Sequence, residues 1–203
     1  ILFGLIFVPA LFAAVGSARR AVESHRALRR TIVAAGTGGH AMALHERAGE
    51  KLELLCVDEN PECLELAQAK ATATSDDVKF SQSRLDSLAL PDNQFDLVVG
   101  NASLISTQRV RKMFAEMVRV AGPGATIALA LPTSSSFGEF FSIYWEALHN
   151  TGLTDHEVAV EHLITELPTI SEVEQMAEDE GLRDVTSWTR IEEFDYDSGE
   201  QFL

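Results

Sequence analysis

Residues 31–40, Thr-Ile-Val-Ala-Ala-Gly-Thr-Gly-Gly-His, decide the fold of this chain. A short run of β-branched and small apolar residues ends in a turn that contains Gly36 and Gly38, and residues 40–48 then read as a helix. The next apolar run, 52–57, reads as a second strand. A strand, a glycine-rich turn, a helix and a strand predict a parallel βαβ unit, in which a ligand can approach the backbone of the turn closely.

The same alternation continues along the chain. We expect further helices over 61–71, 110–120, 137–150 and 171–180, and further strands over 78–81, 95–100, 125–131 and 184–194. Gly122-Pro123-Gly124 is expected to end the helix that precedes it. The pattern predicts an α/β fold, a Rossmann-like, doubly wound and mostly parallel sheet with helices on both faces. We expect one domain over 31–203, preceded by a helical lead-in over 1–30.

Apolar side chains within 137–150 recur at helical spacing. They are Phe137, Phe140, Phe141, Tyr144, Trp145 and Leu148. We interpret this stripe as core, with the lining of a substrate pocket as the alternative.

Composition and charge narrow the class of protein. The chain has 203 residues, and 46% of them are hydrophobic, which excludes wholesale disorder. A formal net charge of −15 would repel phosphate backbones, so we expect no nucleic-acid partner. Residues 151–203 hold fifteen acidic residues against two arginines, a net of −13. We interpret that region as a solvated face, with a docking surface for a protein partner as the alternative.

Cysteine and histidine spacing gives little indication of a special site. The two cysteines stand seven residues apart, and no Cys/His set has zinc-binding spacing, so we predict no metal site. Two cysteines fit a reducing compartment, and we expect a cytoplasmic protein.

The amino-terminal residues 1–18 carry no charge, and five arginines follow within the next twelve residues. This pattern is compatible with the end of a membrane span, but Gly4, Pro9 and Gly16 interrupt it. We favour a core or amphipathic helix and leave lipid contact through 1–18 as the alternative.

Asp58 is a second feature, after the glycine-rich turn, that points to a ligand. It follows the strand 52–57, twenty-two residues after Gly36, where an acid can accept hydrogen bonds from ribose hydroxyls. Together they predict an adenosine-type ligand. A dinucleotide enzyme would have a glycine three places after Gly38, but Ala41 stands there.

Three further segments carry a family resemblance. Val-Asp-Glu-Asn-Pro-Glu at 57–62, Leu-Ala-Leu-Pro-Asp-Asn-Gln-Phe-Asp-Leu-Val-Val at 88–99 and Met-Val-Arg-Val-Ala-Gly-Pro-Gly at 117–124 resemble the class I S-adenosylmethionine-dependent methyltransferases. The resemblance is to the branch that methylates quinone precursors and other small molecules, and it runs from about 31 to 131. It implies S-adenosylmethionine as cofactor and a seven-stranded sheet with an antiparallel last strand. Because Leu203 follows what would be the sixth strand, we expect that last strand to be missing, with an incomplete sheet as the alternative.

The resemblance also implies which residues contact the cofactor. They are Ala35, Gly36, Gly38, Asp58, Arg84, Leu85 and Asn101. Leu85 would pack near the adenine, and Asn101 would border cofactor and acceptor, although such an Asn is equally often a turn residue. No catalytic residue is assigned; His149, His156 and His162 are candidate bases.

The cofactor motif departs from the family pattern at three positions. Ala34 replaces an acid, His40 replaces the third glycine, and Arg84 replaces the acid that receives the adenine amino group. A guanidinium only donates hydrogen bonds, so Asp86 is a candidate replacement acceptor. We therefore expect a methyltransferase acting on a small molecule, with a catalytically inactive, methyltransferase-like scaffold or regulatory subunit for a protein partner as the alternative.

Overall fold

The computed structural model describes eight stretches of the chain. They are residues 28–33, 35–48, 52–74, 78–103, 105–136, 138–153, 161–162 and 166–188. The chain divides into two compact units, one of residues 1–130 with 188–203 and one of residues 131–187. Residues 1–27, which hold most of the expected helical lead-in, lie outside the described part.

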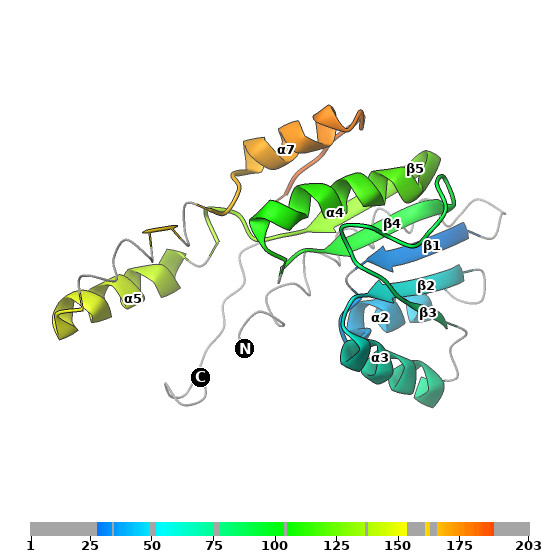
Figure 1. Ribbon diagram of the computed structural model, residues 1–203, viewed down its shortest axis with the longest axis horizontal. Coiled ribbons are helices and arrows are strands. Elements are labelled where there is room, and N and C mark those ends of the chain that lie inside the picture. Colours follow the sequence, from blue (N-terminus) through cyan, green and yellow to red (C-terminus); the bar gives the residue numbers. More distant parts are fainter. Residues whose placement is uncertain are drawn as a thin grey trace. The chain divides into compact units, whose positions relative to one another are not determined.

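The first unit is built on a five-stranded sheet (Figure 1). Its strands are β1 (Leu28–Val33), β2 (Leu52–Asp58), β3 (Val78–Gln82), β4 (Phe95–Asn101) and β5 (Ala121–Ala130). They lie in the order β3-β2-β1-β4-β5, and every neighbouring pair is parallel. Because the order reverses beside β1, the carboxyl ends of β1 and β4 flank the topological switch point, where such sheets bind ligands.

Three helices cover this sheet. They are α2 (Gly39–Ala48), α3 (Pro61–Thr74) and α4 (Thr107–Val120). α2 and α3 contact β2, and α3 also contacts β3, whereas α4 contacts β4 and β5 (Figure 1). The chain reverses its direction across the sheet after β3, so right-handed crossovers place α4 on the face opposite α2 and α3. The predicted doubly wound α/β fold is confirmed.

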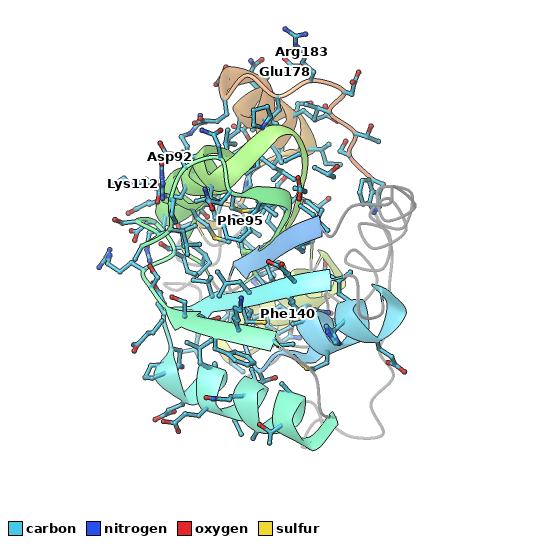
Figure 2. All side chains as sticks on the ribbon, turned by 90° about the vertical axis from the view of Figure 1, so that its right-hand side faces the viewer. Asp92, Phe95, Lys112, Phe140, Glu178 and Arg183 are labelled. Carbon is cyan, nitrogen blue, oxygen red and sulfur yellow. The ribbon has the colours of Figure 1, made fainter. Side chains whose placement is uncertain are left out.

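Apolar side chains fill both faces of the sheet. Leu54, Cys56, Leu97 and Val99 pack with Ala41 of α2 and others in one buried cluster. On the face of α4, every third or fourth residue is buried: Val110, Met113, Phe114, Met117 and Val120. A Cβ at Gly100 would lie 2.6 Å from the Met117 sulfur, so β4 and α4 approach closely there. Phe95, at the start of β4, is also buried (Figure 2).

Polar contacts fix the loop between β3 and β4. Arg119, in the last turn of α4, donates to the backbone oxygens of Leu88 (3.0 Å) and Leu90 (2.8 Å) and forms ion pairs with Asp92 and Glu116. Glu116 accepts in turn from the backbone nitrogen of Leu88 at 2.6 Å. The loop that leads into β4 is thereby attached to α4.

The second unit contains two longer helices, α5 (Gly138–Thr151) and α7 (Ile170–Asp179). Thr169 caps α7 through a reciprocal pair of hydrogen bonds with Glu172. The prediction that the aromatic stripe of α5 is core is wrong: Phe140, Tyr144 and Trp145 are exposed, and among the described members of the stripe only Leu148 is buried. Helical spacing shows that the stripe lies on one face but not what covers it.

Three predicted boundaries are wrong. β1 begins at Leu28, so residues 28–30 belong to the strand and not to a helical lead-in. Gly122-Pro123-Gly124 lies inside β5, where a register shift against β4 and the edge position accommodate a proline. Residues 184–188 form no strand, and Asp184 at their start has a left-handed φ of 57°. The remainder of the strand expected over 184–194 lies outside the described residues.

No helix in the described part of the chain is long and apolar enough to cross a lipid bilayer. The segment 1–18, for which lipid contact was left as an alternative, is not among those residues.

Candidate functional site

The turn after β1 has the geometry that its glycines predict. Gly36 and Gly38 have φ angles of +53° and +76°, in the left-handed region that L side chains rarely adopt. The turn closes through a hydrogen bond of 3.1 Å from the Gly38 nitrogen to the Ala35 oxygen, and Ala35 itself donates to the Val57 oxygen at 3.0 Å. The chain therefore turns directly from β1 into α2 beside the end of β2.

Helix α3 supports this turn from the side. A Cβ at Gly38 would lie 2.7 Å from the Cβ of Ala67, so the turn touches the helix backbone. Lys70 donates to the carbonyl oxygen (2.9 Å) and the hydroxyl (3.2 Å) of Thr37. By contrast, a Cβ at Gly36 would meet nothing within 4 Å. The turn is thus fixed on the α3 side and has open space at Gly36.

Asp58 connects the ends of β1 and β2. Its Oδ2 accepts from the backbone nitrogen of Gly36 at 2.7 Å, and its Oδ1 accepts from the backbone nitrogen of Asn60 at 2.9 Å. The residue is only 7% exposed. A carboxylate offers about four lone-pair sites, so two backbone donors leave acceptor capacity on Asp58 for a ligand hydroxyl.

A chain of ion pairs lies next to Asp58. Arg109, in the first turn of α4, holds both carboxylate oxygens of Glu59, at 2.9 and 2.7 Å. It also pairs with Asp86 at 3.2 Å, and Arg84 holds the same carboxylate through two contacts of 3.1 and 3.0 Å. The hydrogen bond from Arg109, and next that from Arg84, lower the pKa of Asp86 to about 2.

Arg84 and Leu85 lie in the tight turn that follows β3. Residues Arg84 and Ser87 form an antiparallel bridge, so the segment bends back on itself. The Arg84 side chain is 71% exposed, whereas Leu85 is 1% exposed. Leu85 is thus part of the core, and its expected contact with an adenine stays a prediction. Asp86, the candidate replacement acceptor, already has both oxygens in contact with arginines.

Asn101 ends β4 and behaves as a turn residue. Its Oδ1 accepts from the backbone nitrogen of Ser103 at 3.0 Å and also from the Ser103 hydroxyl. The Ala102 nitrogen donates to the Ala130 oxygen at 2.8 Å, which ties this turn to β5. The turn interpretation of Asn101 is therefore supported, and a contact with ligand stays a prediction.

His40 is the second residue of α2 and is half-buried. Burial lowers the pKa of its imidazole, so the ring is neutral at neutral pH. Ala34, another departure from the family pattern, lies outside the described residues. The candidate bases His149 and His162 are exposed in the second unit, and His156 lies outside the described residues.

Two other chemistries find no support among the described residues. No group of three His, Cys, Asp or Glu side chains in that part of the chain could hold a metal ion. Burial raises the pKa of the Cys56 thiol to about 12, so it is no nucleophile at neutral pH.

The residues predicted to contact the cofactor lie together at one edge of the sheet, but the side chains that support them were not predicted. Ala35, Gly36, Gly38, Asp58, Arg84, Leu85 and Asn101 all lie at or just after the carboxyl ends of β1 to β4. Arg109 and Lys70 were not predicted, because they come from helices 50 and 33 residues away from the groups they bind. Nothing in the sequence pattern distinguishes these two from other helical cations.

The site suits two parts of an adenosine-type cofactor that carries an amino acid group. Asp58 offers free acceptor capacity for the ribose hydroxyls, and the space at Gly36 admits a ligand close to the backbone. The start of α2 presents backbone N–H groups suited to a carboxylate. These residues fit the ribose and amino acid parts of the cofactor, whereas Arg84, which the resemblance places near the base, can only donate hydrogen bonds.

Comparison with protein families supports this assignment. Residues 32–124 match the family model of the methyltransferase domain. The chain is 33% identical over 126 residues to a demethylmenaquinone methyltransferase of Deinococcus radiodurans. This match covers 61% of this chain and 52% of that protein. It is 31% identical over 134 residues to one of Thermus thermophilus, covering 63% of this chain and 60% of that protein. The chain thus spans about half to three fifths of the length of these relatives.

Solved structures agree on the fold. A methyltransferase of Aquifex aeolicus, described as dependent on S-adenosylmethionine, superposes with a TM-score of 0.58 at 19% identity. The match covers 83% of this chain and 79% of that one. The family model, the curated relatives and the fold all agree with the resemblance carried by residues 57–62, 88–99 and 117–124. Over residues 32–124 this chain is therefore similar to the methyltransferase domain, and its fold is that of the solved methyltransferase structure.

Proposed function

We propose that this protein transfers a methyl group from S-adenosylmethionine to a small molecule. One observation carries the proposal: the buried carboxylate of Asp58 is oriented by the backbone nitrogens of Gly36 and Asn60 and retains acceptor capacity. A ribose is a ligand that such a group suits, and open space lies beside it at Gly36. S-adenosylmethionine supplies a methyl group on a sulfonium sulfur.

The residues of this chain then have to bind the cofactor, orient the two reactants and exclude water. Asp58 would hold the ribose hydroxyls, and the turn 35–38 with the start of α2 would hold the amino acid group. Because transfer of a methyl group is a direct displacement, fixed orientation of the two reactants supplies most of what the protein contributes. Gly36, Gly38 and Asp58 are the residues on which that orientation would depend, with Ala35 closing the turn.

We propose a quinone precursor as the methyl acceptor. Support comes from the relatives, which are demethylmenaquinone methyltransferases, over the segment in which this chain matches them. Such acceptors are flat and apolar, so they require an apolar contact surface more than charged groups. We also propose a cytoplasmic location, which the unpaired thiols Cys56 and Cys63 support.

The alternative, an inactive scaffold that binds a protein partner through its acidic region, is not favoured. Its motivation was the loss of three cofactor-motif residues, yet the described turn and Asp58 keep the geometry that a ribose requires. On the acidic α7, Glu172 and Glu178 are exposed, which accords with a solvated face.

A direct assay tests the proposed function. The full chain is incubated with S-adenosylmethionine and a reduced demethylated naphthoquinone, and the product is measured by mass spectrometry. We expect an increase in product mass by one methyl group, dependent on protein and abolished by Asp58→Ala. If S-adenosylmethionine binds but neither this acceptor nor a panel of phenols is methylated, the proposed substrate class is wrong. If the cofactor does not bind and no methylated product forms, the proposed activity is wrong.

A further inference from the structure

Four charged side chains from three parts of the first unit form one continuous chain of contacts. Glu59 follows β2, Asp86 and Arg84 lie in the turn after β3, and Arg109 comes from α4. Arg109 lies in the middle: it donates from Nη1 and Nη2 to both oxygens of Glu59 and from Nε to Asp86. Its three contacts measure 2.9, 2.7 and 3.2 Å.

The contact between Arg109 and Glu59 is of the strong kind. Two parallel N–H···O bonds join a planar guanidinium to a carboxylate, a geometry that a lysine cannot reproduce. The side chains of Arg109 and Asp86 are 32% and 11% exposed. A network of this geometry holds its members in place better than isolated exposed ion pairs do.

These contacts hold two turns at the ends of β2 and β3. Glu59 also accepts a backbone hydrogen bond from Leu85. The Ser83 backbone nitrogen donates to the backbone carbonyl oxygen of Asp58 at 3.0 Å. The residue before Glu59 is Asp58, whose carboxylate orientation depends on the same short turn through Asn60. Moving Glu59 would therefore move the group that faces the ribose.

We propose that Arg109 is a positioning residue for the nucleoside part of the cofactor, because it joins the turn that carries Asp58 to the turn that carries Arg84, Leu85 and Asp86. The inference rests on the proposed function, since it concerns the same cofactor site. Arg109 does not contact the reacting atoms. It acts through Glu59 and Asp86, which fix the two turns between which a nucleoside would lie.

The alternative is that Arg109 only stabilises the fold. The two roles differ in what they change. A purely stabilising residue lowers the melting temperature of its variants and leaves the affinity of the folded protein for ligand unchanged. Replacing a positioning residue weakens the binding of every ligand that carries the nucleoside. It also raises the KM for S-adenosylmethionine, while kcat at saturation changes little.

The test compares Arg109→Gln with Lys112→Gln in the full chain. Lys112 lies on the same helix, is exposed and lies at the periphery of the molecule (Figure 2), so its variant removes the same charge without breaking the network. Calorimetry measures S-adenosylhomocysteine and 5′-methylthioadenosine, which lacks the amino acid group. We expect both ligands to bind Arg109→Gln at least tenfold more weakly than the parent, and Lys112→Gln within twofold of it.

Glu59→Gln is the second variant, which breaks the same bidentate contact should Arg109→Gln fold poorly. We expect Glu59→Gln to weaken both ligands, and the double variant to be no weaker than the worse single one. Faster hydrogen exchange at the Asn60 amide in Arg109→Gln, measured without ligand, is also expected. Parental affinities and exchange in both folded variants would overturn the positioning role alone. No binding of either ligand by the parent protein would overturn the proposed function together with it.

Discussion

The carboxylate of Asp58 accepts a hydrogen bond of 2.7 Å from the backbone nitrogen of Gly36, which lies twenty-two positions earlier in the turn after the neighbouring strand β1. This contact spans the ends of two parallel strands and orients the carboxylate from one side. The backbone nitrogen of Asn60 orients it from the other side at 2.9 Å. A buried acid held by two backbone donors is a preorganised acceptor for a further hydroxyl.

Replacing Asp58 with asparagine tests that acceptor. The amide has one acceptor oxygen, so its nitrogen would face a backbone donor or the ligand hydroxyl. Each hydrogen bond left unmade to a buried group costs about 1–3 kcal/mol, and 1.4 kcal/mol is a tenfold change in affinity. We expect Asp58→Asn to bind S-adenosylhomocysteine at least tenfold more weakly in calorimetry.

The matched control is Glu65→Gln, an exposed carboxylate on α3 that undergoes the same change of charge. It should bind within twofold of the parent. Equal affinities of Asp58→Asn and the parent, with both proteins folded, would mean that no ribose lies at Asp58.

Two glycines of the turn should respond differently to alanine. A Cβ at Gly38 would lie 2.7 Å from Ala67, and its φ of +76° disfavours any side chain. Gly39, the first residue of α2, has open space and ordinary backbone angles. We expect Gly38→Ala to lower the free energy of unfolding by about 1–3 kcal/mol. Gly39→Ala should be neutral or slightly stabilising, because alanine is the better helix former.

Urea unfolding of the two glycine variants measures this difference directly. Equal stabilities would show that the turn does not pack against α3 as described.

The network around Arg109 predicts a pH dependence. Arg109 holds the pKa of Asp86 at about 2 and lowers that of Glu59, first of all through its hydrogen bonds. Their ordinary values are about 4. A carboxyl group whose pKa is lowered in the folded state adds stability above its unfolded pKa, and that stability is lost as the pH falls through the folded pKa. The stabilisation should therefore be constant at neutral pH and decrease between about pH 4 and 2.

Melting temperatures of the parent and of Arg109→Gln between pH 7 and 3 check this. The difference between the two proteins should stay constant down to about pH 5 and become smaller below it. A difference that stays the same at pH 3 would contradict the network.

Arg84 offers a test at the base. Its side chain is 71% exposed and only donates hydrogen bonds, whereas an adenine amino group requires an acceptor. Arg84→Gln supplies an amide oxygen and should strengthen binding of S-adenosylhomocysteine several-fold. Stability should change by less than about 0.5 kcal/mol, because exposed ion pairs contribute little. An unchanged affinity would show that the base does not lie beside residue 84.

Much of the fold follows from local patterns in the sequence. Residues 97–100 form an apolar run and become the buried centre of β4, and 31–33 with the glycine turn form the β1–α2 connection. The errors occur where tertiary contacts override a local signal. Gly122-Pro123-Gly124 reads as a break, but β5 continues through it in a register shift against β4, where Gly124 has a left-handed φ of +78°.

The site was only partly predictable for a similar reason. Gly36, Gly38 and Asp58 are close in sequence to the strand ends, so parallel topology alone brings them together. The partner of Glu59 is a helical arginine 50 residues later, and no spacing rule connects the two. Local patterns thus predicted which groups lie together at the carboxyl ends of the strands, while the groups that hold them required the structure.

Titration of the full chain with S-adenosylmethionine and S-adenosylhomocysteine by calorimetry tests the central claim most directly. The geometry of Asp58 and Gly36 predicts binding of both ligands with micromolar dissociation constants, lost in Asp58→Ala and kept in Glu65→Gln. An absence of heat and of thermal stabilisation at millimolar ligand would contradict the assignment of a working cofactor site.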